Sequence, residues 1–245
     1  SCLSGKQKEL DYERKFFPMS LIHETEQEKQ MSEAFVNSAF LALSEGFQDA
    51  YTYFTRDKVF SNAQTGNVVL MSQEFMAGNF IGGIKYLLPF LAFGLGVLVT
   101  EQINARYKMA KRIHWRQLII LIEIAILAIV GFIPHSLNMA ATVLVSFSCA
   151  MQVQAFRKVN GFAYASTMCI GNLRSGTDAL SAFLREKRKE PLIKAFHYYG
   201  IIFFFAVGAG IGGNLSVAWG IHTIWVSCIL LLISMVFMWY EKYRK

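Results

Sequence analysis

The chain has 245 residues, 54% of them hydrophobic and 17% charged, and its formal net charge is +7. This apolar content excludes a disordered chain, and the basic charge comes without an RNP-like motif or zinc spacing, so nucleic-acid binding is not expected. Charged residues avoid two long tracts: there are none between Lys194 and Glu241, and Glu123 is the only one between Arg116 and Arg157. Each tract can cross a bilayer twice at about 20 residues per helix. The sequence therefore predicts an all-α polytopic membrane protein.

Residues 1–32 form a polar N-terminal extension that lacks the apolar core of a secretory signal peptide, so no cleaved leader is expected in it. Eight apolar segments follow the extension. Their ranges are 33–55, 59–78, 86–105, 117–134, 138–156, 161–184, 195–217 and 221–240.

The second and sixth segments are weak candidates for lipid-facing helices because both contain several polar residues. The second contains Asn62, Gln64, Asn67 and Glu74, and the sixth contains Asn172, Arg174 and Asp178. Irregular backbone at membrane depth is tolerated where it is buried in protein or lines a cavity. We therefore expect both segments to be re-entrant or broken helices.

Basic residues set the expected orientation. The fourth and fifth segments form a hairpin with an uncharged turn and basic outer ends, and the seventh and eighth segments form another. By the positive-inside rule the outer ends are cytoplasmic, so the sixth segment both starts and finishes inside. This arrangement gives six full transmembrane helices plus two re-entrant elements, with cytoplasmic N and C termini.

Counting spans divides the chain into two membrane units, residues 33–134 and 138–240, followed by a basic cytoplasmic tail at 241–245. Three crossings per unit make the two repeats inverted relative to each other. Matching residues support the duplication: Ser44 and Gln48 with Ser148 and Gln152; Ser61, Gly66 and Asn67 with Ser166, Gly171 and Asn172; and Gly94 and Gly96 with Gly208 and Gly210. Eight spans in two parallel repeats are the alternative.

The motifs G-F-Q-D-A at 46–50 and N-A-Q-T-G-N at 62–67, with A-M-Q at 150–152 and I-G-N at 170–172, resemble those of the YoaK family of bacterial transmembrane proteins. The resemblance covers about residues 33–240. It implies an integral membrane location and a duplicated helical fold, and it implies no chemistry because the family has no established activity.

Glu45 and Asp49 lie four residues apart in the first span and therefore share one helix face. Ionisable residues inside a membrane are costly and are functional candidates by default. Two acids this close in a low-dielectric environment cannot both ionise easily, as a proton carrier requires. We expect Arg174 to be their partner, with Asp178 beside it. A structural ion-pair cluster that locks the repeats together is the alternative interpretation.

The remaining candidates lie around the two Gly-Asn pairs, which either line a polar pathway or cap broken helices. They are Gln64, Thr65, Gly66, Asn67, Gly171 and Asn172. Glu123, alone in an apolar span, is expected to be a buried residue paired with a polar neighbour.

These features favour a small secondary transporter or permease of the bacterial cytoplasmic (inner) membrane, moving a small polar or ionic solute through a midplane site. The alternative is a non-transporting membrane scaffold or sensor subunit. No nucleophile paired with a base and no metal-ligand spacing points to an enzyme, a cofactor or a metal. The expected partners are the lipid bilayer and an unidentified solute, and homo-oligomerisation stays open.

Overall fold

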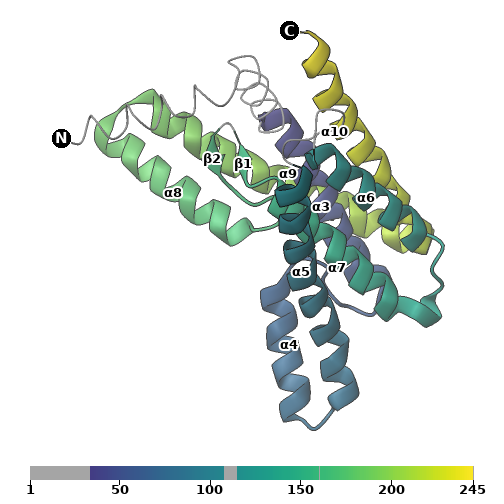
Figure 1. The fold of residues 1–245 in the computed structure, drawn as a ribbon. Helices are drawn as coiled ribbons and strands as arrows, with labels where there is room; N and C mark the ends of the chain where they lie inside the picture. Colours follow the sequence, from purple (N-terminus) through teal and green to yellow (C-terminus); the bar gives the residue numbers. More distant parts are fainter. Residues whose placement is uncertain (1–33, 108–114, 160, 245) are drawn as a thin grey trace.

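The computed structural model describes residues 34–107, 115–159 and 161–244, so the polar extension expected at 1–32 lies outside the described residues. The described chain is almost entirely helical (Figure 1), which confirms the helical fold class. Its α-helices are α3 (Phe35–Thr55), α4 (Gln64–Met76), α5 (Phe80–Tyr107), α6 (Trp115–Val130), α7 (Asn138–Ala155), α8 (Cys169–Glu186), α9 (Lys189–Trp219) and α10 (Trp225–Arg244). Two 3-10 turns, η1 (His135–Leu137) and η2 (Gly220–Ile224), join helices, and two short strands, β1 (Lys158–Val159) and β2 (Phe162–Ala163), precede α8.

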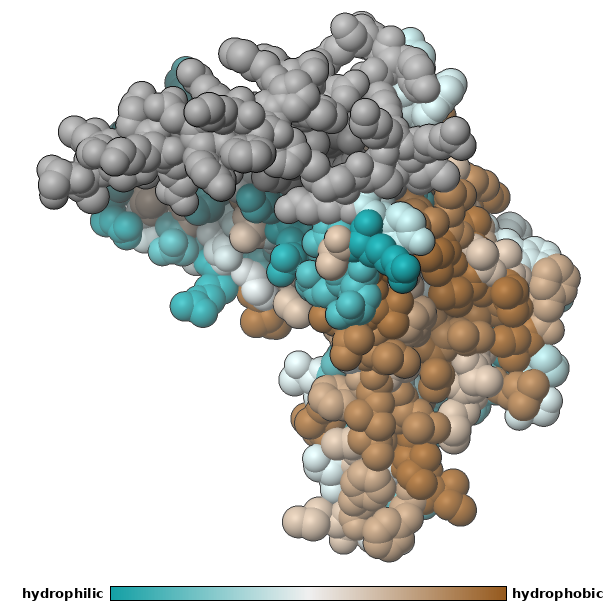
Figure 2. All heavy atoms as spheres, viewed as in Figure 1, coloured by the Kyte–Doolittle hydropathy of each residue, from teal (hydrophilic) through white to brown (hydrophobic). Residues whose placement is uncertain are grey.

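Three stretches of the described chain are long and apolar enough to cross a membrane: Phe80–Tyr107, His135–Ala155 and Lys189–Tyr240, the last running through α9, η2 and α10. Large apolar side chains are exposed along them, among them Leu95, Leu98, Phe203, Ile229 and Val236. Figure 2 shows this apolar surface over the bundle and over the lower end of α5. A hydrocarbon environment satisfies such a surface, so the protein is compatible with a membrane.

Two pairs of parallel helices form the centre of the bundle, α3 with α9 and α5 with α7. Glycines bring the backbones together: a Cβ added to Gly208 of α9 would lie 2.0 Å from the Leu43 oxygen of α3. In the second pair, a Cβ added to Gly96 of α5 would lie 2.4 Å from the Phe147 oxygen of α7. Small residues permit this close approach of transmembrane backbones.

The C-terminal end of α3, the α6–α7 turn and the α9–α10 turn meet at one end of the bundle, which we call the Arg56 end. Arg56 is fully buried and donates to the Tyr51 hydroxyl at 2.7 Å, the Ile133 carbonyl at 2.9 Å and Asn138 Oδ1 at 3.0 Å. Tyr51 in turn donates to the carbonyl of Ile221 at 3.0 Å. One guanidinium therefore joins three elements that are far apart in the sequence.

Two arms extend from this bundle (Figure 1), one made of α4 with the first half of α5, the other of α8 with the first half of α9. At about 1.5 Å per residue, the 28-residue α5 and the 31-residue α9 are about 42 and 46 Å long. Both lengths exceed the hydrocarbon thickness of about 30 Å, so each helix is long enough to cross the bilayer and still extend into its arm.

The boundaries differ from the sequence prediction at both broken segments. The helix expected at 59–78 is the shorter α4, because residues 59–63 form a turn that packs on α3. The segment expected to be helical from 161 starts instead as the β1–β2 hairpin, where Gly161 adopts a φ of +83° that favours glycine.

Candidate functional site

Polar side chains lie on the face of α3 that is turned into the bundle, in the middle of the helix. Ser44, Glu45, Gln48 and Asp49 are all buried, the first three with no exposed surface. They repeat at three- and four-residue intervals and so form one helix face. Buried polar groups need partners, and these are supplied by α6, α7 and the loop before α4.

The Glu45 carboxylate accepts a hydrogen bond from an amide on each oxygen. Asn62 Nδ2, in the loop before α4, donates to Oε2 at 3.2 Å, and Gln152 Nε2, on α7, donates to Oε1. The carbonyl oxygens of the same two amides, Asn62 Oδ1 and Gln152 Oε1, are buried and have no hydrogen-bond partner. Glu45 therefore links the first half of the chain to the second.

Asp49, one turn further along α3, has a different environment, because its side chain faces the loop that leads into α4. Its Oδ1 accepts from the Ser61 hydroxyl at 3.3 Å and from the Asn62 backbone N–H at 3.1 Å. A carboxylate beside the first residues of a helix is stabilised by the free N–H groups and the helix dipole. Asp49 thus holds the turn between α3 and α4.

Glu123, on α6, is fully buried and accepts from Gln48 Nε2 at 3.0 Å through Oε1. Its second oxygen, Oε2, has no hydrogen-bond partner. Gln48 also accepts from the Cys149 thiol at 3.3 Å. We call Glu45, Asp49 and Glu123, with the amides of Gln48, Asn62 and Gln152, the carboxyl cluster.

No Lys or Arg forms a salt bridge with any of these three carboxyl groups in the part of the chain that the structure describes. An isolated ionised carboxylate in a low-dielectric interior costs several kcal/mol. The cluster therefore requires that some of its carboxyl groups be protonated, or that a cation enter it.

Asn67 and Asn172 hold the chain at the two helix breaks in the same way. Each donates through Nδ2 to the carbonyl seven residues earlier, Asn67 to Phe60 and Asn172 to Ala165, both at 2.7 Å. Both are buried near the beginnings of α4 and α8. These contacts are of the kind expected if the two asparagines cap the starts of the helices.

The structure brings together only some of the residues singled out in the sequence. Gln64 joins the α4 turn by donating to the Ser61 carbonyl at 2.8 Å and accepting from Asn67 at 3.1 Å, and Gly66 is half-buried against Phe60. The exposed ones are Thr65, Gly171, Arg174 and Asp178.

The pairing of Glu45 and Asp49 with Arg174 is not formed in the structure. Arg174 and Asp178 are exposed on α8, whereas the partners of both acids are amides, a hydroxyl and backbone N–H groups. A buried acid can be satisfied by neutral donors, and spacing along the sequence does not reveal which kind of donor will be used.

Sequence reasoning did not assign a role to Gln48, Asn62, Cys149 or Gln152. Gln48 and Gln152 do carry a signal, because they occupy matching positions in the two halves of the chain. Glu123 was expected to be buried with a polar neighbour, and its bond to Gln48 confirms this.

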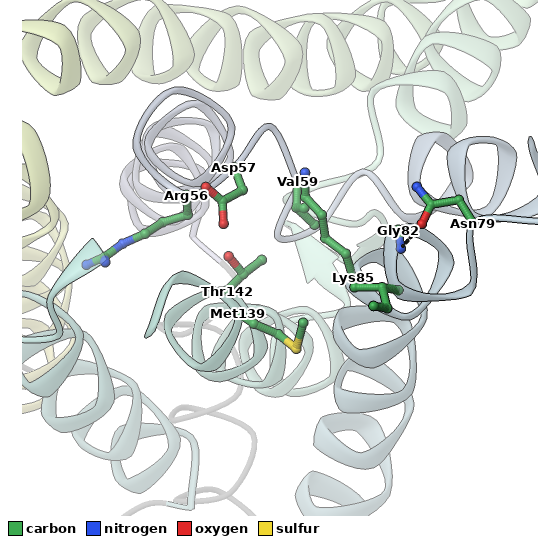
Figure 3. A pocket seen from close by; sticks show the side chains of 9 residues that line it. Arg56, Asp57, Val59, Asn79, Gly82, Lys85, Met139 and Thr142 are labelled. Carbon is green, nitrogen blue, oxygen red and sulfur yellow. Dashed lines mark hydrogen bonds between the residues drawn. The ribbon is translucent and has the colours of Figure 1, made fainter. Parts of the chain in front are cut away.

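A separate pocket of about 290 Å³ lies at the Arg56 end, between the α3–α4 loop, the start of α5 and α7. Figure 3 shows Arg56 pointing away from the other lining residues. The charged lining groups that remain are Asp57 and Lys85, beside the polar Asn79 and Thr142. This pocket therefore offers one charge of each sign outside the carboxyl cluster.

Comparison with known proteins identifies the family. The family model for DUF1275, a family of proteins of unknown function, matches residues 38–237. YoaK-like membrane proteins carry this domain, in agreement with the resemblance noted in the sequence. No curated protein and no solved structure matches the chain. The chain belongs to the DUF1275 family.

Proposed function

We propose that this protein is a small secondary transporter of the cytoplasmic membrane that moves a small polar or ionic solute. The observation that supports this most is the carboxyl cluster, three buried acids inside an apolar helix bundle that form no salt bridge with any Lys or Arg among the described residues. Acids held inside the membrane are costly, and transporters use them to bind coupling ions. The pocket at the Arg56 end has room for a small solute.

The proposed architecture is six full spans and two half-helices, α4 and α8, in two inverted repeats. Helix directions support it: α3 runs parallel to α9, as the contacts of Gly208 with Leu43 and of Gly212 with Phe47 require. Helix α5 runs parallel to α7, because Gly96 contacts Phe147 and, further along both helices, Glu101 accepts from Gln154. The end of α3 meets the start of α7 at Arg56, so these two helices run in opposite directions. Each helix of residues 33–134 would then have an antiparallel counterpart in residues 138–240.

In this arrangement the two half-helices begin beside the carboxyl cluster. The loop that leads into α4 is held by Asp49, and Cys169, the first residue of α8, lies within electrostatic reach of the same carboxyl group. Half-helices that start in the bilayer interior are a recurring device for ion and solute sites. Asn67 and Asn172 would support these breaks, and Glu45 would serve as the coupling acid.

The basic residues support a cytoplasmic location for both termini under the positive-inside rule. In the described part of the chain, Lys and Arg residues are sparser at the Arg56 end than at the proposed cytoplasmic end. The Arg56 end would therefore face the opposite side. A multi-pass protein of the inner membrane follows from the same assignment.

Flux measurements on the purified protein test this function. Vesicles that contain the protein and an entrapped pH-sensitive dye would be exposed in turn to amino acids, carboxylates, polyamines and inorganic anions. We expect one class to enter the vesicles or change their internal pH, and Glu45→Gln to abolish the effect. Glu101→Gln is the matched control, because Glu101 is a half-exposed glutamate paired with Arg157 at 3.8 Å.

Two results would contradict the proposal: no solute moving faster than through protein-free vesicles, or equal coupled flux in Glu45→Gln and the wild type. The first would favour a scaffold or sensor subunit.

A further inference from the structure

We propose that the coupling ion is a proton carried by Glu45, that one of the two amides of Asn62 and Gln152 rotates when it binds, and that Glu123 keeps its own proton throughout. This inference rests on the proposed transport function and names the ion that the carboxyl cluster takes. Three observations carry it: the donors that each carboxyl group receives, the unpartnered oxygens, and the elements that Glu45 joins.

The three acids receive unequal numbers of donors. Glu45 has an amide N–H on each oxygen, and Asp49 has a hydroxyl and a backbone N–H at a helix N-terminus. Glu123 has one amide on Oε1 and nothing on Oε2. A carboxylate is acceptor-only and needs donors, so the least supported group is the one that stays protonated. Glu123 is therefore the acid that stays neutral.

Glu45 differs from the other two acids in that its surroundings suit both of its protonation states. Asn62 and Gln152 now point N–H groups at it, as a charged carboxylate requires. The unpartnered oxygens Asn62 Oδ1 and Gln152 Oε1 belong to these same two amides. Rotating either side-chain amide would turn its oxygen toward Glu45, where it could accept from a protonated carboxyl group. The site is thus equipped for a proton to come and go.

The titratable neighbours of the cluster are few. Asp49 shares α3 with Glu45, Glu123 faces it from α6, Cys149 from α7, and Cys228 lies near Glu123 on α10. On the half-helix side, Cys169 of α8 lies within reach of Asp49. None of these groups is cationic, so none of them can neutralise an ionised Glu45. Binding a proton neutralises its carboxylate without any other side chain.

Proton binding also connects the two halves mechanically. Asn62 belongs to the loop before α4, and Gln152 belongs to α7. Protonation of Glu45 turns one of its two oxygens from an acceptor into a donor, so the amide that donates to that oxygen must rearrange. The proton comes from water at one membrane face and leaves to the other. Rearranged contacts between the halves are what alternating access requires.

Infrared spectroscopy tests the proposal without any transport assay, so its failure is distinguishable from failure of the transport function. The full-length protein in lipid films would be titrated with pH while the carbonyl stretch of protonated carboxylic acids is recorded. We expect two buried bands, one that titrates and one that persists. Glu45→Gln should lose the titrating band, Glu123→Gln should lose the persistent one, and Glu101→Gln should keep both.

A second variant covers the case in which Glu45→Gln does not fold. Gln152→Leu removes one amide partner of Glu45, so the titrating band should move to higher wavenumber because a hydrogen bond to the carboxyl group is lost. Gln154→Leu is the matched control, because Gln154 lies two residues away and bonds to Glu101 at the surface. An unmoved band in Gln152→Leu would overturn the assignment to Glu45.

Sodium is the alternative coupling ion, and the same infrared sample tests whether the site binds it. Replacing choline chloride with sodium chloride should leave the titrating band unchanged if the site binds a proton alone. Loss of that band on adding sodium, absent in Glu45→Gln, would show a sodium site and overturn the proposal.

Discussion

The buried guanidinium of Arg56 permits a quantitative test of how the bundle ends are held. Arg56→Met keeps an unbranched apolar stem but removes the donors that now reach Tyr51, Ile133 and Asn138. A fourth acceptor, the Val130 carbonyl at 3.1 Å, lies at the C-terminal end of α6 and also accepts from the Ile133 N–H, so it keeps one partner in the variant, whereas Asn138 Oδ1 and the Ile133 carbonyl lose the donor from Arg56. The substitution thus leaves several acceptors buried and unpaired.

Each hydrogen bond to a charged donor contributes about 1.5–3 kcal/mol, and losses within one network do not add fully. We therefore expect Arg56→Met to lower the free energy of unfolding by about 3–5 kcal/mol, the range measured when one partner of a buried charged network is removed. At about 2–4 °C per kcal/mol for a chain of this size, the melting temperature should fall by about 6–20 °C.

Thermal unfolding of the purified protein in detergent would measure this shift. Arg157→Met is the control, because Arg157 is 64% exposed and its pair with Glu101 is long, at 3.8 Å, so it should cost less than about 1 kcal/mol. Equal melting temperatures for Arg56→Met and Arg157→Met would refute the reasoning, since the buried network would then contribute no more than a surface pair.

Packing and capping give two further tests by the same thermal assay. Gly208→Ala and Gly96→Ala place a Cβ against helix backbone and should each lower the free energy of unfolding by about 1–3 kcal/mol or more. Their controls on the same helices, Gly210→Ala and Gly94→Ala, have nothing within 4 Å and should be neutral or stabilising. Equal effects of a variant and its control would contradict the packing. Asn67→Ala and Asn172→Ala each remove a 2.7 Å bond to a carbonyl seven residues earlier and should each cost about 1–3 kcal/mol. A neutral result for either variant would mean that its break is held by other contacts.

Much of the fold follows from the distribution of charge along the sequence. The long uncharged tracts predict the apolar helices correctly, and the polar second and sixth segments contain α4 and α8, which lie outside the three stretches long and apolar enough to cross a membrane. The turn before α4 and the β1–β2 hairpin escaped prediction, because side-chain bonds and a positive φ at Gly161 decide them.

The candidate site could be predicted only in part. Glu45 and Asp49 stand out because charge inside an apolar helix is rare, yet nothing in the sequence says that amides, and not Arg174, would satisfy them. The matching glycines illustrate the same limit. The sequence aligns Gly96 with Gly210, whereas in space Gly96 and Gly208 are the ones that contact a partner helix. Register between helices is set by packing, which a single sequence does not display.

Cysteine accessibility in intact cells tests most directly whether two inverted halves meet at the carboxyl cluster. Lys58 and Lys187 are exposed, the first between α3 and α4, the second between α8 and α9. With all native cysteines replaced, Lys58→Cys should react with an impermeant maleimide from outside, and Lys187→Cys only after permeabilisation. Lys58→Cys reacting only from inside and Lys187→Cys from outside would instead mean eight spans in parallel halves, and the inverted arrangement proposed around Glu45 would be wrong.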